Sequence, residues 1–230
     1  MNKMLQVLGY GALGVIGLLV VLLVASSLLI SPDLTKEQLI TKYKDEKSFL
    51  YFLPSGAEAH IRENGDRNKP ALLMLHGSNA SLHTWDKMIG ELQDDFRIIS
   101  IDLPGHGLTG ITPQDDYSIM GMARFTREVV EAFELEDVTL VGNSMGGEVA
   151  LRYALMFPRE VKALVLISSA GIEPDENESS VGAFALAGTD LGRAMMRYFT
   201  PKFLVENTLR DVVADPDNVI TDEMATRYWD

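Results

Sequence analysis

Four short apolar runs, separated by segments with helical spacing, constrain the fold of this 230-residue chain more than any other feature. Each run is apolar on both of its alternating faces, which indicates a strand covered by helices on both sides of a parallel sheet. Strands that alternate with helices predict an α/β fold with a doubly wound, mostly parallel sheet. The runs occupy residues 71–75, 96–101, 138–141 and 161–167, and the helical segments occupy residues 81–92, 119–133 and 146–156.

Each of these runs ends in a turn rich in Gly, His, Ser or Asp. Because the carboxyl ends of parallel strands share one edge of a sheet, we expect the functional site there. The turn Gly-Asn-Ser-Met-Gly-Gly at residues 142–147 follows a strand and opens a helix. A sharp strand-to-helix turn exposes the serine at its apex, and small residues at both ends let the chain cross closely. Ser144 is therefore the candidate nucleophile, and a purely structural glycine turn is the alternative.

Two backbone amides are candidate donors to an oxyanion beside that serine. The N–H of Met145 lies at the start of a helix, where it points toward developing negative charge. The second donor is expected in the loop after residues 71–75, and we assign it to the N–H of Ser78, with Asn79 as the alternative.

The remaining polar residues of these turns are interpreted as structural. His76 ends the first apolar run, and we expect it to be hydrogen-bonded within the fold. Asp102 begins the turn Asp-Leu-Pro-Gly-His-Gly, and we expect it to be buried and bonded to backbone, with His106 as part of the same turn. His60, in a predicted hairpin, is interpreted as incidental. The four histidines are scattered, so no metal site is expected. No cofactor is expected either.

An uncharged stretch rich in Leu, Val and Ile occupies residues 7–30. As a helix rising about 1.5 Å per residue it would cross a bilayer core of about 30 Å. We interpret residues 1–30 as an N-terminal transmembrane anchor, with a cleaved signal peptide as the alternative. Lys3 favours an extracytoplasmic, periplasmic domain, whereas the lysines after the stretch favour the opposite orientation. The prediction is a single-pass membrane protein whose catalytic domain is extracytoplasmic.

The rest of the chain divides into three predicted parts. Residues 31–47 form a linker helix, which opens with a capping box formed by Thr35 and Gln38. Residues 48–172 form the α/β core, beginning with a hairpin. Residues 173–230 form a helical cap region, which either packs on the sheet or lines an apolar pocket. Candidate helices there span residues 189–198, 201–213 and 222–229, with Thr200 and Thr221 as N-caps of the last two.

Composition excludes several classes of protein. The net charge of −13 makes binding to nucleic acid improbable, because such binding depends on basic residues. The absence of cysteine excludes a disulfide scaffold, a thiol nucleophile and a thiolate-bound metal. The sequence leaves the oligomeric state open.

Three motifs, in this order and spacing, resemble the α/β-hydrolase fold family over residues 48–171: His-Gly-Ser at 76–78, Asp-Leu-Pro-Gly-His-Gly at 102–107 and Gly-Asn-Ser-Met-Gly-Gly at 142–147. The last motif is similar to those of esterases, monoacylglycerol-type lipases and hydrolases that cleave carbon–carbon bonds in ring-fission products. A serine at this position, in place of aspartate, separates the chain from haloalkane dehalogenases and epoxide hydrolases. Cofactor-free haloperoxidases remain an alternative.

The resemblance implies a catalytic triad that runs from Ser144 to an acid and then a histidine, after two further strands. All four histidines precede Ser144, and no strand pattern follows residue 172. We therefore expect a C-terminally truncated, inactive hydrolase whose acid and histidine lie beyond residue 230. The leading hypothesis is a serine hydrolase that cleaves a small apolar carboxylic ester through an acyl-enzyme. The alternatives are a carbon–carbon bond hydrolase and a catalytically incompetent binding module.

Overall fold

The computed structural model describes residues 17, 33–172, 189–190 and 200–230. The chain separates into two compact units, Thr35–Asn177 and a second unit that combines Met1–Leu34 with Glu178–Asp230. The division into anchor, linker, core and cap stays a prediction.

The first unit begins with α2 (Lys36–Tyr43), which starts where the sequence predicts it. The Thr35 hydroxyl accepts from the Gln38 N–H at 3.3 Å, and the Gln38 side-chain oxygen accepts from the Thr35 N–H at 2.8 Å. These two bonds form the predicted capping box and satisfy amides that have no partner within the helix.

Within the described residues, six strands form one sheet in the order β1-β2-β4-β3-β5-β6. The first two strands form an antiparallel hairpin, and β2 pairs antiparallel with β4. The other pairs are parallel, so the sheet is mostly parallel as predicted. The strands are β1 (Ser48–Phe52), β2 (Glu58–Asn64), β3 (Ala71–Leu75), β4 (Arg97–Ile101), β5 (Val138–Asn143) and β6 (Val161–Ile167).

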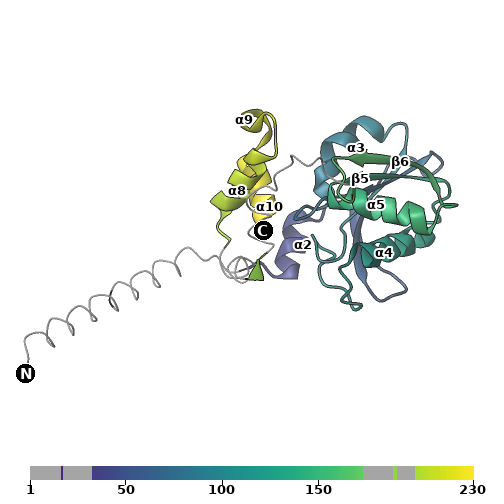
Figure 1. Ribbon diagram of the computed structural model, residues 1–230, viewed down its shortest axis with the longest axis horizontal. Helices are drawn as coiled ribbons and strands as arrows, with labels where there is room; N and C mark the ends of the chain where they lie inside the picture. Colours follow the sequence, from purple (N-terminus) through teal and green to yellow (C-terminus); the bar gives the residue numbers. More distant parts are fainter. Residues whose placement is uncertain (1–16, 18–32, 173–188, 191–199) are drawn as a thin grey trace, which may run out of the picture. The chain divides into compact units, whose positions relative to one another are not determined.

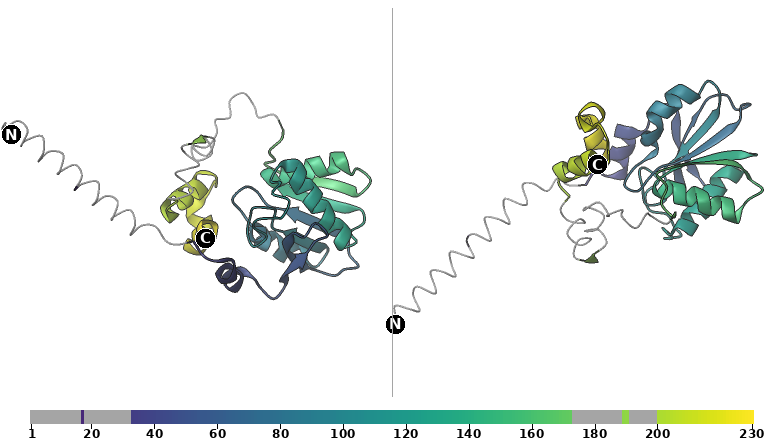
Figure 2. Two further views of the ribbon diagram at one scale, coloured as in Figure 1. Left: turned by 90° about the horizontal axis from the view of Figure 1, so that it is seen from below. Right: turned by 45° about the horizontal axis from the view of Figure 1, so that its top comes forward.

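Helices cover both faces of this sheet. α4 (Ile119–Ala132) and α5 (Met145–Met156) lie side by side on one face, called here the α4/α5 face (Figure 1). The 3-10 helix η1 (Leu82–Trp85) and α3 (Asp86–Leu92) lie on the other, the η1/α3 face (Figure 2). The predicted helix over residues 81–92 is thus two short elements.

The core lies on both faces, because successive residues of each strand point to opposite sides. The α4/α5 face carries the larger apolar cluster, whose largest fully buried side chains are Ile61, Leu73, Leu75, Ile99, Ile101, Leu103, Leu140 and Tyr153. The η1/α3 face carries a smaller one, made of Leu72, Met74, Trp85, Ile89, Ile98 and Val141.

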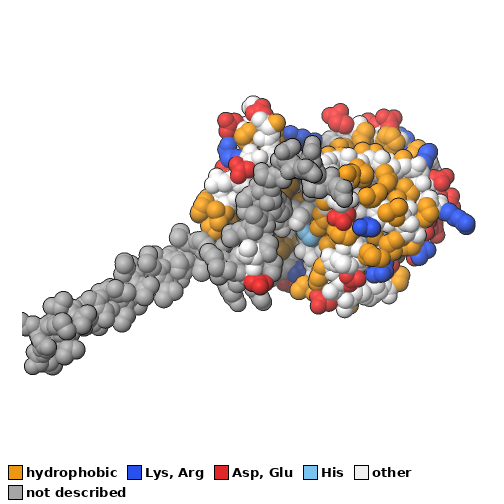
Figure 3. Space-filling view, viewed as in Figure 1, with side chains coloured by type: hydrophobic (Ala, Val, Ile, Leu, Met, Phe, Trp, Pro, Cys, Tyr) orange, Lys and Arg blue, Asp and Glu red, His pale blue; other side chains and the backbone are white. Residues whose placement is uncertain are grey.

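The sequence predicts β6 as a strand buried on both faces, and the structure differs from this prediction. Most of its residues are half-buried or exposed, and Val165 is 45% exposed. Among the described strands β6 pairs only with β5, so one of its edges is unpaired. Leu155 on the neighbouring helix α5 is 66% exposed, and Figure 3 shows hydrophobic side chains over this part of the surface. A strand with an unpaired edge cannot be buried as a central strand is.

The described part of the second unit contains three helices: α8 (Lys202–Asp211), α9 (Pro216–Val219) and α10 (Asp222–Trp229). Thr221 caps α10 as predicted, since its hydroxyl accepts from the Met224 N–H at 3.1 Å. The predicted cap of α8 is wrong by one residue: Pro201 is the N-cap and the helix begins at Lys202. Residues 191–198 of the remaining predicted helix lie outside the described residues.

The predicted membrane localisation is corrected by the structure. A helix needs about 20 apolar residues to cross a bilayer. No helix among the described residues is long and apolar enough, and the longest, α4, has 14 residues. This finding contradicts the prediction of a single-pass membrane protein attached through an N-terminal helix, with an extracytoplasmic domain. Apart from Gly17, residues 7–30, on which that prediction rested, lie outside the described residues.

Candidate active site

Ser144 lies at the junction of β5 and α5, with a backbone φ of 50° and ψ of −118°. A positive φ is uncommon for a residue with a Cβ, and it persists only where the surrounding structure holds it. Here the end of β6 does so. The Ser144 N–H donates to Ile167 O at 3.0 Å, and Ser144 O accepts from the Ala170 N–H at 3.0 Å. The turn has the sharp strand-to-helix geometry that the sequence predicts.

Two glycines make the turn sterically possible. A Cβ at Gly142 would lie 2.4 Å from Gly146 O, and a Cβ at Gly146 would lie 2.2 Å from Leu75 O. Both distances are far below van der Waals contact, so no side chain fits at either position. The close approach places the first turn of α5 directly against the end of β3.

The loop that follows β3 lies beside Ser144. A Cβ at Gly77 would be 3.3 Å from Ser144 Cβ and 2.9 Å from Asn143 Oδ1. The next residue, Ser78, is exposed, and Met145 is the first residue of α5. Within the described part of the chain, neither the Ser78 N–H nor the Met145 N–H donates a hydrogen bond. Two unused backbone donors therefore occur at the same edge of the sheet as the serine.

Asp102 is buried directly after β4, and its carboxylate accepts three hydrogen bonds. Its Oδ1 accepts from the Leu82 N–H at 2.7 Å, and its Oδ2 accepts from the Leu108 N–H at 2.8 Å. The same Oδ2 lies 2.7 Å from His60 Nδ1. Burial alone would raise the pKa of Asp102, but the hydrogen bond and charge of His60 outweigh it and hold this pKa below its ordinary value. The ionised carboxylate ties together two loops and β2, which confirms the structural interpretation.

The prediction that His60 is incidental is wrong. Its side chain is fully buried on β2 and bonds Asp102, and its backbone N–H donates to Thr109 Oγ1 at 2.8 Å. The sequence contained a signal for this role: His60, Arg62 and Asn64 are polar residues two positions apart, so they lie on one face of the strand. The partner of His60, Asp102, is 42 residues away, so local spacing does not reveal it.

His76 is buried at the end of β3 and bonds backbone at both ring nitrogens. Nε2 accepts from the Leu103 N–H at 3.0 Å, and Nδ1 lies 2.7 Å from Gly77 O. Burial lowers the pKa of His76 to about 4, against a smaller opposite effect of Asp102. The ring is therefore neutral near pH 7, which confirms the prediction of a structural histidine.

No histidine is hydrogen-bonded to Ser144. His83 Nδ1 lies 3.2 Å from Ser81 Oγ, and His106 Nδ1 lies 3.0 Å from Pro104 O. The Ser144 hydroxyl itself has no partner within the described residues. Over the same residues, no group of three carboxylate or imidazole side chains is arranged to hold a metal ion.

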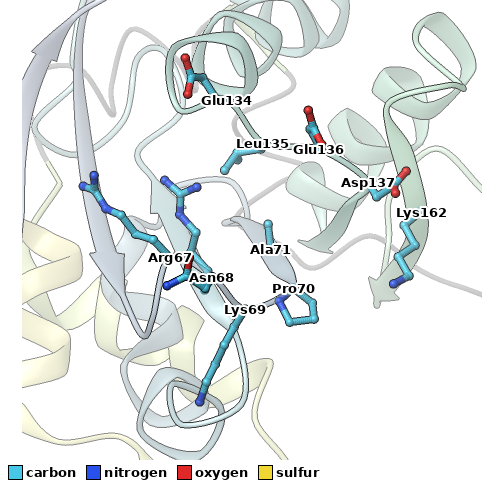
Figure 4. A pocket seen from close by; sticks show the side chains of 11 residues that line it. Arg67, Asn68, Lys69, Pro70, Ala71, Glu134, Leu135, Glu136, Asp137 and Lys162 are labelled. Carbon is cyan, nitrogen blue, oxygen red and sulfur yellow. The ribbon is translucent and has the colours of Figure 1, made fainter.

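An open hollow of about 330 Å³ lies at the opposite edge of the sheet (Figure 4). Arg67, Lys162 and Asp137 are among the side chains that line it, so both signs of charge are present. Asp137 precedes β5 and Ser144 follows it, which places the hollow and the serine at opposite ends of that strand. The hollow is therefore separate from the candidate active site.

Comparison with known proteins agrees with this geometry. The family model described as the alpha/beta hydrolase fold matches residues 70–204, more than half of the chain. The chain therefore belongs to the α/β-hydrolase fold family.

The similar proteins include an uncharacterised protein of Mycobacterium tuberculosis, 36% identical over 127 residues, which are 55% of this chain and 36% of that protein. A human monoacylglycerol lipase is 37% identical over 108 residues, 46% of this chain and 32% of the lipase. The solved structure of a meta-cleavage product hydrolase from Pseudomonas fluorescens is 25% identical with a TM-score of 0.65, over 80% of this chain and 64% of that one. The chain spans about a third of the length of the curated relatives it matches.

Proposed function

We propose that this chain carries the nucleophile of a serine hydrolase that cleaves small, lipophilic carboxylic esters. The observation that carries the proposal is the left-handed backbone of Ser144, at the apex of a strand-to-helix turn and beside two unused backbone N–H groups. A serine hydroxyl reacts at a useful rate only when it is exposed, activated and placed beside such donors. The likeness to monoacylglycerol lipases supports an ester as the substrate.

In the proposed reaction Ser144 Oγ attacks the ester carbonyl carbon. The carbonyl oxygen becomes an oxyanion, which accepts hydrogen bonds from the N–H groups of Ser78 and Met145. The alcohol leaves with a proton, and an acyl-enzyme remains on Ser144. Water then attacks the acyl group, the carboxylic acid leaves, and the serine hydroxyl is regenerated.

The general base is proposed to lie outside the present sequence. Each of the four histidines precedes Ser144, and none is hydrogen-bonded to it. His60 and His76 are also buried within the fold and bonded at their rings to Asp102 and Gly77. The activating histidine and its acid would accordingly be contributed by another part of the protein.

A carbon–carbon bond hydrolase is the second candidate. The likeness to a meta-cleavage product hydrolase, with a TM-score of 0.65, favours it over other chemistries of this fold. Both reactions would use the same serine, so the substrate separates them and the nucleophile does not.

The test uses the full-length protein that contains this chain, with a fluorophosphonate probe and two substrates, a p-nitrophenyl ester and a vinylogous diketone. We expect labelling and ester hydrolysis in the wild type, and a loss of about 10³-fold or more in Ser144→Ala. Ser168→Ala is the matched control, because Ser168 is an exposed serine with φ 44° at the end of β6. Turnover of the diketone alone would favour the second candidate. Absence of labelling and of turnover in the wild type would contradict both candidates and favour a binding module, whereas labelling that survives in Ser144→Ala would assign the nucleophile to another residue.

A further inference from the structure

The protonation of His76 follows from its two partners. Leu103 offers a backbone N–H to Nε2, so Nε2 must carry the lone pair. The Gly77 carbonyl oxygen lies next to Nδ1. A carbonyl oxygen can only accept a hydrogen bond, so Nδ1 must carry the proton. The ring is thus one defined tautomer, with a hydrogen bond at each end. The low pKa of His76, about 4 as a result of burial, keeps the ring in this neutral form.

The bond to Gly77 O determines how the following peptide is turned. The carbonyl oxygen and the N–H of a trans peptide point in opposite directions, and the described residues contain no cis peptide. When the Gly77 carbonyl points at the His76 ring, the Ser78 N–H points away from that ring.

The order of the strands in the sheet shows which residues lie on the side to which the Ser78 N–H points. β3 lies between β4 and β5 in the sheet. The His76 ring reaches toward the β4 side, since it bonds Leu103, two residues after β4 ends. The opposite side is the β5 side, where Ser144 lies and where a Cβ at Gly77 would be 3.3 Å from Ser144 Cβ.

We propose that His76 is a positioning residue: by donating from Nδ1 to the Gly77 carbonyl, it turns the Ser78 N–H toward the oxyanion that forms at Ser144. The inference rests on the proposed function of Ser144. It extends that function by naming the donor that lies nearer to the Gly77 carbonyl, at 2.7 Å against 3.3 Å for the Ala80 N–H, and so opposes flipping of the Gly77–Ser78 peptide. A flipped peptide would present a carbonyl oxygen to the oxyanion in place of a donor, and the loss of one such donor costs about 10²–10³ in kcat.

Two substitutions separate this role from a merely structural one. The side-chain amide nitrogen of His76→Asn stands where Nδ1 stands and can still donate to Gly77 O. The side chain of His76→Gln reaches the position of Nε2, where it can accept from Leu103 but not replace Nδ1. Each variant removes one hydrogen bond of the same buried ring, so a structural role predicts similar losses in both.

The experiment measures ester hydrolysis by the full-length protein and its two variants. We expect kcat to fall by about 10²–10³ in His76→Gln, with KM nearly unchanged, and by less than about tenfold in His76→Asn. Equal losses of kcat in the two variants, or a loss that appears only in KM, would overturn the inference.

A second measurement does not depend on activity. In the ¹⁵N spectrum of the wild type we expect the His76 proton on Nδ1, and in a crystal structure of His76→Gln we expect a reversed Gly77–Ser78 peptide. A proton on Nε2, or an unchanged peptide in that variant, contradicts the role of His76. If Ser144→Ala retained full hydrolysis while the tautomer and the peptide behaved as expected, the proposed nucleophile would be wrong and the His76 geometry right.

Discussion

The two faces of the sheet are built from the same strands but from different chemistry. Under α4 and α5 the buried side chains are almost all apolar, with Thr126 as a buried polar residue. Under η1 and α3 a small apolar cluster adjoins a row of buried polar side chains: His60, Arg62, Asn64, His76, Ser100 and Asp102. Among the residues that the structure describes, several polar atoms of this row have no hydrogen-bond partner, including His60 Nε2 and Ser100 Oγ.

The two faces therefore contribute differently, one mainly to the free energy of folding and the other mainly to the positions of loops. Apolar burial is non-directional and scales with the area removed from water, so the α4/α5 face contributes most to the free energy of folding. Buried hydrogen bonds are directional, and they hold loops in one arrangement at a modest net gain. The buried hydrogen bonds of the η1/α3 face therefore set the positions of the loops after β3 and β4, and one of those loops lies beside Ser144.

The largest expected effect on stability comes from removing the Asp102 carboxylate on the η1/α3 face. Asp102→Val leaves the Leu82 N–H, the Leu108 N–H and His60 Nδ1 without their acceptor. We expect the free energy of unfolding to fall by about 3–5 kcal/mol, measured by urea denaturation. The control is Thr126→Val on the other face, which removes one bond to Met122 O and should cost about 1 kcal/mol. Equal losses in the two variants would remove the distinction between the faces.

A smaller effect is expected from pH. Burial lowers the pKa of folded His76 from 6.5 to about 4, so the unfolded chain takes up the proton first as the pH falls. The contribution of neutral His76 to the free energy of unfolding is fully present above about pH 6.5. As the pH falls to about 4 this contribution is lost, which lowers the free energy of unfolding by about 3 kcal/mol. Urea denaturation across this range tests it. His76→Gln does not titrate there and should show a flatter pH dependence; an equally steep one would assign the effect to other groups.

The smallest effect compares two neighbours on β4. Ile98 and Ile99 are both fully buried but point to the η1/α3 and α4/α5 faces. We expect Ile99→Val to cost about 1 kcal/mol of stability and Ile98→Val less, because the adaptable side chains of Met74 and Met88 are in the smaller cluster. Thermal or urea unfolding of both variants measures the difference. A larger loss of stability for Ile98→Val would mean that the η1/α3 face is the more tightly packed.

Local patterns predicted most elements of the first unit. The capping box of α2 and the turn at Ser144 follow from residues within a few positions of one another, and the structure has both. The apolar runs predicted β3, β4 and β5, because a strand buried on both faces needs no distant information to be recognised. The half-exposed state of β6 did not follow in this way, since it depends on which strands pair with it.

The class of fold and the position of Ser144 can be predicted from local patterns, because periodicity, glycine spacing and turn chemistry act over short stretches of chain. The hydrogen bonds between His60 and Asp102 and between Leu103 and His76 could not be predicted in this way. Both contacts join residues far apart in the chain, which become neighbours when β2, β4 and β3 pair. Hydrogen bonds of this kind depend on the register between strands, and register is a property of the assembled sheet.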